Sequence, residues 1–300
     1  MLRYIFLFYS FGLFAQQEAE PMRQLALYGE QIMLASEREG REEANAAFKE
    51  LLIEILENSL SPFDLDFSEV KNLSALLSDD KQVYIFTWIL PDLPGKEKFN
   101  GLMIIRRGKK KKQDFALHEL DDVALELSGA PYQMLSAGRW YGALYYQIFT
   151  VKHKSDTYYM LMGYRMLSDQ VQKKLIDVLH IASDGVPRFG AKIFNVKKLM
   201  DYTYERPPYR LFFQYSARVS ASFRYVPSEG MIILDHLSPP ENSPPRVWSF
   251  YGPDFSYDGL EFIKGRWELR EEISFDSGLR QPTPQNPPKK DPRTGKVQRK

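Results

Sequence analysis

Cysteine is absent from all 300 residues of the chain. Disulfide bonds, zinc sites built on cysteine and catalysis by a thiol nucleophile are therefore excluded. A chain of this length can instead be stabilised by its own hydrophobic core, as one large or two smaller domains. Aromatic residues make up 14% of the sequence. Because Tyr and Phe are common in strands, this composition favours a β-rich fold.

Long apolar runs are also scarce. Residues 1–15, MLRYIFLFYSFGLFA, carry one early cation, Arg3, and precede the polar segment QQEAEP. This layout predicts a signal peptide over residues 1–15, because the run is shorter than the roughly 18 residues of a membrane helix. Leu13 stands where a small residue is preferred before a cleavage site, so an uncleaved anchor is the alternative. No later run approaches that length, and we expect an exported, periplasmic protein with no transmembrane span after signal cleavage.

Positive charge is concentrated in two segments. Residues 280–300 contain seven Lys or Arg and one Asp among several prolines, with almost no large apolar residue. We therefore expect a disordered, basic, Pro-rich tail there. The other segment, RRGKKKKQD at 106–114, joins two expected strands and contains Lys109, Lys110, Lys111 and Lys112. Both segments predict contact with an envelope protein or an anionic envelope component, and a solvated loop and tail are the alternative. An exported chain gives no reason to expect a nucleic-acid partner.

The pattern of apolar residues changes from helical to strand-like along the chain. In 40–59, GREEANAAFKELLIEILENS, apolar residues recur at helical spacing opposite a glutamate-rich face,. Residues 21–39 form a weaker helical pattern, and Gly40 is expected to divide the two helices. From Lys81 onward, strand-like runs follow one another through short turns, although 173–183 also fits a helix,. The sequence predicts an α+β, β-rich fold: a helical N-terminal region (16–60), then a mostly antiparallel body (61–279).

The clearest alternation lies at 211–225, LFFQYSARVSASFRY, where apolar and polar residues take turns. This predicts one half-buried strand, with a bend near Ser216 because fifteen residues is unusually long. Its polar face, 214–224, consists of small hydroxyls and two arginines. A cleft over that face would place Arg218, Arg224 and Ser220, with His236 nearby, around an anionic ligand. The alternative is a plain solvent-exposed face.

Five blocks in the chain resemble recurring segments of a family of exported Bacteroidota proteins. They are YIFTW (84–88), WYGALYY (140–146), FGAKIF (189–194), ILDHLSP (233–239) and YGPDFSYDGLEF (251–262). The resemblance covers roughly residues 40–275 and leaves out the basic tail. It implies a location in the envelope of a Gram-negative cell and a β-rich body. That family has no assigned activity, so the resemblance implies no catalytic residues.

The segment DFSYDG at 254–259 resembles the first half of a calcium-binding loop. Asp254, Ser256 and Asp258 stand at ligand positions 1, 3 and 5, and Gly259 stands at the turn position,. The twelfth position is Gly265, so the bidentate acid that closes such a loop is missing. The alternative interpretation is a short strand, a turn at 258–259 and a hairpin closed by Lys264 and Gly265.

Recognisable catalytic motifs are missing. The sequence HELDD at 118–122 has Asp122 where a zincin has its second histidine,. The phosphate loop, the dinucleotide fingerprint and the hydrolase elbow are absent, and no cofactor is predicted,. His236 could serve as a general base only with an acid from elsewhere, because Asp235 points to the other side of a strand. We therefore expect a non-catalytic envelope protein. The alternative is a periplasmic hydrolase or small-anion-binding protein that uses the 214–224 face.

Overall fold

The computed structural model describes residues 5–93, 96–107 and 114–273, and the side chains of residues 5–19 are left out of that description. The basic loop 109–112 and the tail 280–300 lie outside the described residues, as do residues 1–4 of the predicted signal peptide. The partner predictions made for that loop and tail therefore stay predictions.

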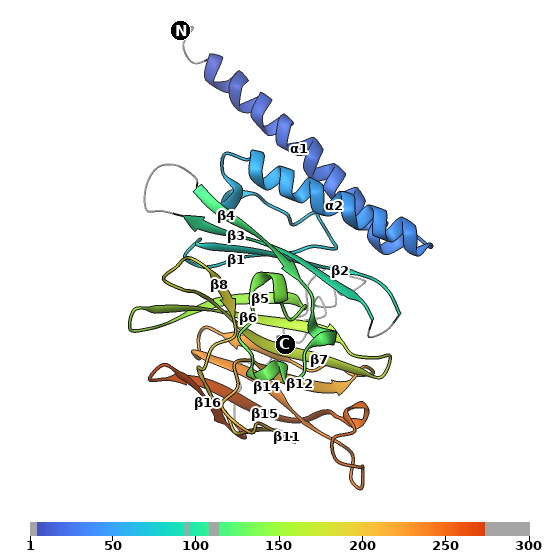
Figure 1. Ribbon diagram of the computed structural model, residues 1–300, viewed down its shortest axis with the longest axis vertical. Coiled ribbons are helices and arrows are strands. Elements are labelled where there is room, and N and C mark those ends of the chain that lie inside the picture. The colour runs from blue at the N-terminus through green and yellow to red at the C-terminus, as the bar shows by residue number, and fades with distance from the viewer. Residues whose placement is uncertain (1–4, 94–95, 108–113, 274–300) are drawn as a thin grey trace, which may run out of the picture.

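Two helices form the N-terminal layer, α1 (Ile5–Leu34) and α2 (Arg38–Asn58) (Figure 1). As the spacing predicted, α2 buries Ala44, Phe48, Leu52 and Leu56. The helices are divided at 35–37, and the prediction that Gly40 divides them is wrong, because Gly40 lies in the first turn of α2. Arg41 closes the break, since its Nη1 donates to the carbonyls of Ala35 and Ser36. In the described ranges, no helix is both long and apolar enough to cross a membrane.

Within the described residues, the strands form three sheets and one short ribbon. The first sheet, in the order β1-β2-β3-β4, contains β1 (Ser74–Leu77), β2 (Val83–Leu90), β3 (Lys98–Arg107) and β4 (Asp114–Asp121). The second sheet, in the order β12-β7-β6-β5 with β8 on β7, contains β5 (Leu144–His153), β6 (Asp156–Met166), β7 (Val171–Ile181), β8 (Pro187–Phe189) and β12 (Leu211–Ser216). The third sheet, in the order β13-β14-β15-β16-β9, contains β9 (Phe194–Asn195), β13 (Phe223–Val226), β14 (Met231–Ser238), β15 (Gly252–Ile263) and β16 (Arg266–Arg270). The ribbon pairs β10 (Lys198–Leu199) with β11 (Tyr202–Thr203).

Figure 1 shows these elements as stacked layers: the helices, then the first, second and third sheets. Each junction has its own apolar cluster. The helices and the first sheet share one around Phe48 and Trp88, the first and second sheets share one around Trp140 and Leu161, and the second and third sheets share one around Trp267. The α+β, β-rich prediction is confirmed, because two N-terminal helices are followed by antiparallel sheets.

Two strands lack the alternation of polar and apolar residues because their sheets are covered on both faces. In β2, Ile85 packs toward the second sheet and Phe86 packs toward the helices. In β7, Leu175 packs toward the first sheet and Ile176 toward the third. A strand buried on both sides reads as a continuous apolar run, so its period does not separate it from a buried helix. The segment 173–183, which also fitted a helix, lies mostly in β7 and is a strand.

Tight turns close the hairpins where the sequence placed them. Lys154 connects β5 to β6 with φ of 55°, and Gly185 lies between β7 and β8 with φ of 77°. Lys264 and Gly265 connect β15 to β16, both with positive φ. Side chains are rarely tolerated in that conformation, and a Cβ at Gly265 would also lie 2.5 Å from the ring of His153,.

The prediction of a single strand over 211–225 is wrong. β12 pairs with β7 as far as its end at Ser216; the residue before it, Tyr215, lies opposite Gln172 of β7. A turn follows, and the chain then enters β13 in the third sheet, paired with β14. Leu211 and Phe213 of β12 and Phe223 of β13 pack on the cluster between the second and third sheets, and this shared burial is why apolar residues recur at both ends of the alternation. The residues 214–224 therefore do not share one strand face.

Candidate functional site

The four residues predicted to surround an anionic ligand are distributed over three elements. Arg218 and Ser220 lie exposed in the turn after β12, Arg224 lies exposed on β13, and His236 lies on β14. The cleft proposed over the 214–224 face loses its geometric basis, because the structure contains no such face. His236 instead contacts Asp254, which the sequence analysis had assigned to a possible calcium loop.

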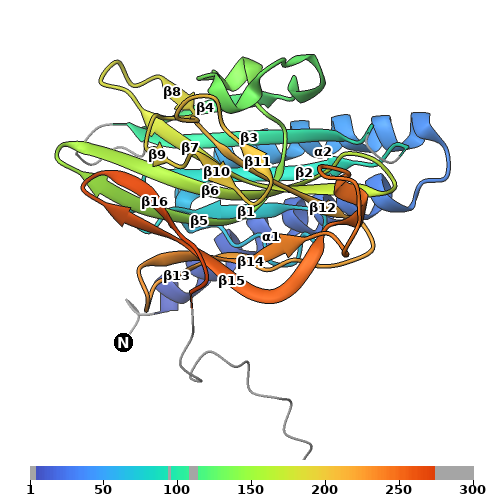
Figure 2. The ribbon, with the colours of Figure 1, turned by 90° about the horizontal axis from the view of Figure 1, so that it is seen from below.

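His236 lies where β14 and β15 lose their register. Asp235 pairs with Tyr257 and Leu237 pairs with Pro253, so residues 254–256 of β15 lie opposite the single residue His236. This is a β-bulge in β15, the long curved strand beside β14 in Figure 2,. The bulge brings the Oδ2 of Asp254 to 2.7 Å from the Nδ1 of His236. The two side chains are about one third exposed, at 33% and 32%.

The bulge requires an unusual backbone. Phe255 has φ of 70°, in the left-handed region, and its side chain is 93% exposed. A bulky residue seldom adopts this conformation, and the strain is of order 1–3 kcal/mol. This conformation brings Ser256 close to Asp254. The hydroxyl of Ser256 donates to the Oδ1 of Asp254 at 2.7 Å, and the backbone N–H of Ser256 donates to the same oxygen at 3.1 Å.

Asp254 is held as a carboxylate. Burial raises its pKa, but the hydrogen bonds from Ser256, His236 and Ser238 outweigh burial and lower that pKa well below the ordinary range,. A permanently ionised carboxylate at Nδ1 fixes the orientation of the imidazole and favours a proton on that nitrogen. The other ring nitrogen then remains for a ligand.

A pocket of about 530 Å³ opens beside this pair. It lies between β14, the end of β16 and the β10–β11 ribbon, and its walls come from Lys198, Met200, Asp201, His236, Leu237, Ser238, Pro239, Asp258, Glu271 and Glu272. Asp258 is buried, accepts a hydrogen bond from the backbone N–H of Glu272 at 3.0 Å, and has its pKa raised by burial. Four carboxyl groups, one lysine and one imidazole thus surround a space large enough for a small ligand.

Both sequence interpretations of DFSYDG are corrected by the fold. Asp258 and Gly259 pair with Leu234 and Ile233 inside β15, so neither a calcium loop nor a turn forms there. The metal hypothesis for Asp254, Ser256 and Asp258 loses its loop geometry. In the part of the chain that the structure describes, no three His, Asp or Glu side chains are grouped as a metal site. The predicted hairpin through Lys264 and Gly265 is confirmed.

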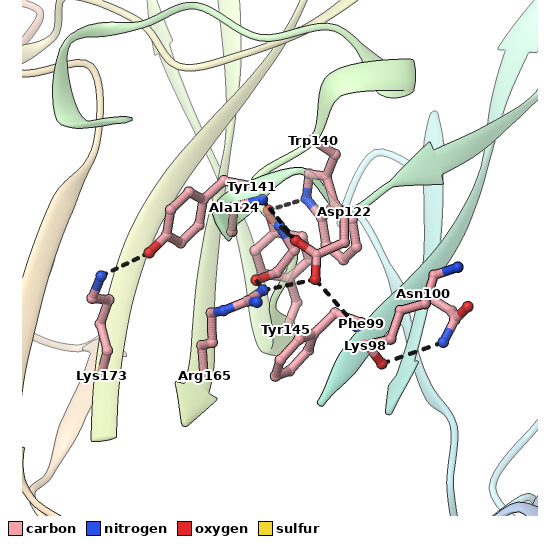
Figure 3. A network of polar contacts seen from close by, with 11 residues as sticks. Lys98, Phe99, Asn100, Asp122, Ala124, Trp140, Tyr141, Tyr145, Arg165 and Lys173 are labelled. Carbon is pink, nitrogen blue, oxygen red and sulfur yellow. Dashed lines mark hydrogen bonds and ion pairs between the residues drawn. The ribbon is translucent and has the colours of Figure 1, made fainter. Parts of the chain in front are cut away.

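A second polar cluster is buried between the first and second sheets (Figure 3). At its centre, Asp122 accepts hydrogen bonds from Arg165 Nη1 at 2.8 Å and from the N–H groups of Phe99, Ala124 and Gly142. Arg165 also donates to the carbonyl of Gly142 and stacks its guanidinium on Phe99. Through these hydrogen bonds, Asp122 links the start of β3 and the 122–142 connection to Arg165 of β6. The zincin-like HELDD segment lies in β4 and this connection, whereas a zincin needs it on a helix,.

Beside this ion pair lies a lysine that has no carboxylate partner among the described residues. Lys173 of β7 is 8% exposed, and its Nζ donates to the hydroxyl of Tyr141 at 2.7 Å. The amine lies 4.2 Å from the ring centroid of Phe212 and 5.3 Å from that of Tyr141. Burial, with a smaller effect of Arg165, lowers the pKa of Lys173 to about 7. Burial also raises the pKa of Tyr141 to about 12, so its phenol stays protonated.

A third buried group lies further along the same face of β7. Asp177 and Arg210 form an ion pair at 3.1 Å, and both side chains are fully buried. Arg210 also donates to the carbonyls of Ala130, Gln133 and Phe189, while Asp177 accepts from the hydroxyl of Tyr145 at 3.3 Å. Every side-chain nitrogen and oxygen atom of this ion pair has a hydrogen-bond partner within the protein, so we assign this group a structural role,.

Sequence reasoning missed Lys173, Asp177, Arg165 and Arg210. A signal was present in KKLIDVLH, because Lys173 and Asp177 alternate with Leu175 and Leu179 on one strand face. A charged residue in register with buried leucines indicates a buried polar group once the segment is known to be a strand. That knowledge came only with the fold.

No protein-family model matches the chain, and neither a curated protein nor a solved structure was found to match it.

Proposed function

We propose that the protein is exported and acts in the cell envelope as a non-catalytic binding protein, with the pocket beside His236 as its ligand site. One observation supports the site: a pocket of about 530 Å³ whose wall contains an imidazole that Asp254 holds at Nδ1. Export is supported by the leader-like residues 1–15,.

The lining of the pocket selects the class of ligand. Asp201, Asp258, Glu271 and Glu272 are acceptors, and among the described residues Lys198 is the one lysine in the wall. Such a wall favours groups that donate hydrogen bonds, such as ammonium, guanidinium or hydroxyl groups, and disfavours anions. We therefore replace the anionic ligand expected from the sequence with a ligand rich in donors, either a small molecule or a side chain of a partner protein.

The test is thermal melting with defined probes: spermidine, arginine amide, N-acetylglucosamine and inorganic phosphate. A probe at about 100 Kd adds about 2.7 kcal/mol to the free energy of unfolding. That gain corresponds to roughly 5–10 °C for a domain of this size. We expect a donor-rich probe to raise the melting temperature and phosphate to have no effect.

Two variants locate the binding. His236→Gln and Asp254→Asn should abolish the stabilisation, because the first removes the imidazole and the second replaces the carboxylate, 2.7 Å from Nδ1, by a neutral amide. His180→Gln is the matched control, since His180 lies in the second sheet with its ring tilted against that of Tyr158. The proposal fails if no probe stabilises the wild-type chain, or if His236→Gln keeps the full shift.

A hydrolase is the second candidate, and the His236–Asp254 pair is the observation that favours it. A carboxylate that orients an imidazole is the arrangement of a general base. Turnover of nitrophenyl esters or phosphates that is lost in both His236→Gln and Asp254→Asn would favour catalysis over binding. Stabilisation by a probe without any turnover would favour the binding protein.

A further inference from the structure

A second pocket, with a volume of about 220 Å³, carries more positive than negative charge. It lies where α2 begins and β2 ends, in the two N-terminal layers of the molecule (Figure 1). The charged residues in its wall are Arg38, Arg41, Lys96, Lys98, Glu42 and Asp92. Four cations against two carboxylates give this wall a net charge of +2. The pocket therefore attracts an anionic group.

The two arginines are held in place by the protein and still have unused donors. Arg38 Nε donates to Glu42 at 2.8 Å, and Arg38 Nη1 lies 3.9 Å from the Oδ2 of Asp92. Arg41 Nη1 donates to two carbonyls in the break between the helices. Among the described residues, neither the Nε nor the Nη2 of Arg41 has an acceptor, and of the two only Nε is covered by protein atoms. Because both guanidinium groups are already positioned, they lose little freedom when a ligand binds.

The two lysines have no competing partner in the part of the chain that the structure describes. Lys98 is the first residue of β3 and Lys96 lies two residues before it, and both side chains are exposed. Neither amine forms an ion pair or a hydrogen bond with a described side chain or carbonyl. Their charge is therefore available to a ligand in the pocket.

The two carboxylates in the wall offer acceptors as well. Glu42 Oε1 accepts from Arg38, and Asp92 Oδ1 accepts from the backbone N–H of Leu93 at 2.8 Å. The other oxygen of each carboxylate has no hydrogen bond from the described residues. A ligand that fits this wall thus combines one anionic group with hydrogen-bond donors.

We propose that this pocket binds a small hydroxylated carboxylate, the class to which the hexuronic acids belong. The ligand carboxylate takes the remaining donors of Arg38 and the Nη2 of Arg41, and its hydroxyls donate to Glu42 and Asp92,. Phosphate suits the wall less, because a dianion has few donors and meets two carboxylates. The volume is below the roughly 300–1,000 Å³ of sites for drug-sized ligands, so the ligand should be about one sugar ring in size.

This site is separate from the pocket beside His236. The start of α2 and the connection between β2 and β3 lie in the helical layer and the first sheet, whereas His236 lies on β14 in the third sheet, at the opposite end of the stack (Figure 1). The two walls also carry opposite net charge, so the two ligands should not compete.

The experiment is isothermal titration calorimetry on the full-length chain with three probes: glucuronate, glucose and inorganic phosphate. Glucose keeps the ring and lacks the carboxylate, whereas phosphate keeps the charge and lacks the hydroxylated ring. We expect glucuronate to bind about tenfold more tightly than glucose, the gain of one charge-assisted hydrogen bond. Phosphate should bind more weakly than glucuronate. Added NaCl should weaken the binding of glucuronate, because the lysines are exposed to screening.

The two exposed lysines locate the binding without disturbing a structural contact. Lys96→Gln combined with Lys98→Gln should weaken glucuronate binding about tenfold, since it removes both unpaired cations. Lys152→Gln combined with Lys154→Gln is the matched control, because it removes two exposed cations from the β5–β6 hairpin and should leave the affinity unchanged.

Four results would overturn the proposal. They are the absence of glucuronate binding to the wild-type chain at millimolar concentrations, equal binding of glucose, equal binding of phosphate, and an unchanged affinity in the Lys96 and Lys98 double variant. Each result is independent of the probes that test the pocket beside His236, so the two proposals fail separately.

Discussion

Replacing Lys173 by methionine should raise the free energy of unfolding by about 2 kcal/mol at pH 7. In the folded chain, the pKa of Lys173 is lowered from 10.5 to about 7, so folding removes a proton that the unfolded chain keeps. At about 1.4 kcal/mol for each pH unit of difference, the full shift corresponds to about 5 kcal/mol, of which about 4 kcal/mol applies at pH 7, where half of Lys173 is still protonated,. Methionine has similar length and no charge, but it leaves the Tyr141 hydroxyl without its partner, which offsets about 1–3 kcal/mol,.

The direction in which the free energy of unfolding changes with pH tests this prediction more sharply than its value at a single pH. Between pH 7 and pH 10 the unfolded wild-type chain binds one proton more than the folded chain at this position, so its stability rises with pH. Below pH 7 both forms are protonated and the cost of the buried charge is present in full. Lys173→Met lacks this dependence. Urea unfolding at pH 7 and pH 9 should show the variant losing about 2 kcal/mol or more of its advantage over that range.

Two controls accompany this measurement. Lys173→Met combined with Tyr141→Phe removes both partners of the hydrogen bond, and it should be at least as stable as the single variant. Lys152→Met changes an exposed lysine on β5 and should alter stability by less than 0.5 kcal/mol or so at either pH,. A variant that is less stable than the wild type at pH 7, with an unchanged pH dependence, would contradict the buried, neutral state of Lys173.

Replacing Arg210 by methionine should lower the free energy of unfolding by about 3–5 kcal/mol at pH 7. The change leaves the carboxylate of Asp177 fully buried without its cation, which is the costly way to disrupt a buried ion pair,. It also removes the donor that Arg210 supplies to the carbonyls of Ala130, Gln133 and Phe189. The 130–135 connection and the end of β8 would then lose their common attachment to β7.

The effect of pH on this variant follows from Asp177. Burial raises the pKa of Asp177, and Arg210 opposes that rise. Without Arg210 the folded chain holds a proton on Asp177 to higher pH than the unfolded chain does, so stability falls as pH rises above the ordinary aspartate range. Urea unfolding should therefore show a smaller loss at pH 5 than at pH 8.

An exposed ion pair in the hairpin formed by β7, which carries Asp177, and β8 provides the control. Arg188 and Asp184 lie 2.8 Å apart with side chains 38% and 51% exposed. Arg188→Met should cost less than about 1 kcal/mol. The double variant Arg210→Met with Asp177→Leu should lose less than the sum of the two single variants, because the second change removes the unpaired charge. Additive losses would show that the two residues act independently.

The helical hairpin, the β-rich body and most tight turns follow from local patterns in the sequence. The spacing of Phe48 and Leu52 indicates one buried helix face, and the Lys264–Gly265 turn indicates a hairpin. These features depend on residues close together in the chain, where backbone preferences and periodicity act. Length, the absence of cysteine and the leader-like N-terminus were likewise readable from the sequence.

The stacking of three sheets and the composition of both polar sites were decided by the tertiary structure. The alternation over 211–225 is continuous, yet the chain changes sheets within it, and Leu211 and Phe213 of the first strand share an apolar cluster with Phe223 of the second. His236 meets Asp254 only because β15 carries a bulge opposite it. Lys173, Tyr141 and Arg165 come from different elements. The sequence by itself determined the helical N-terminal region, the β-rich body and most hairpin turns. The course of 211–225, the strand at 173–183, and which charged side chains are buried beside which partners depended on long-range packing that local patterns do not encode.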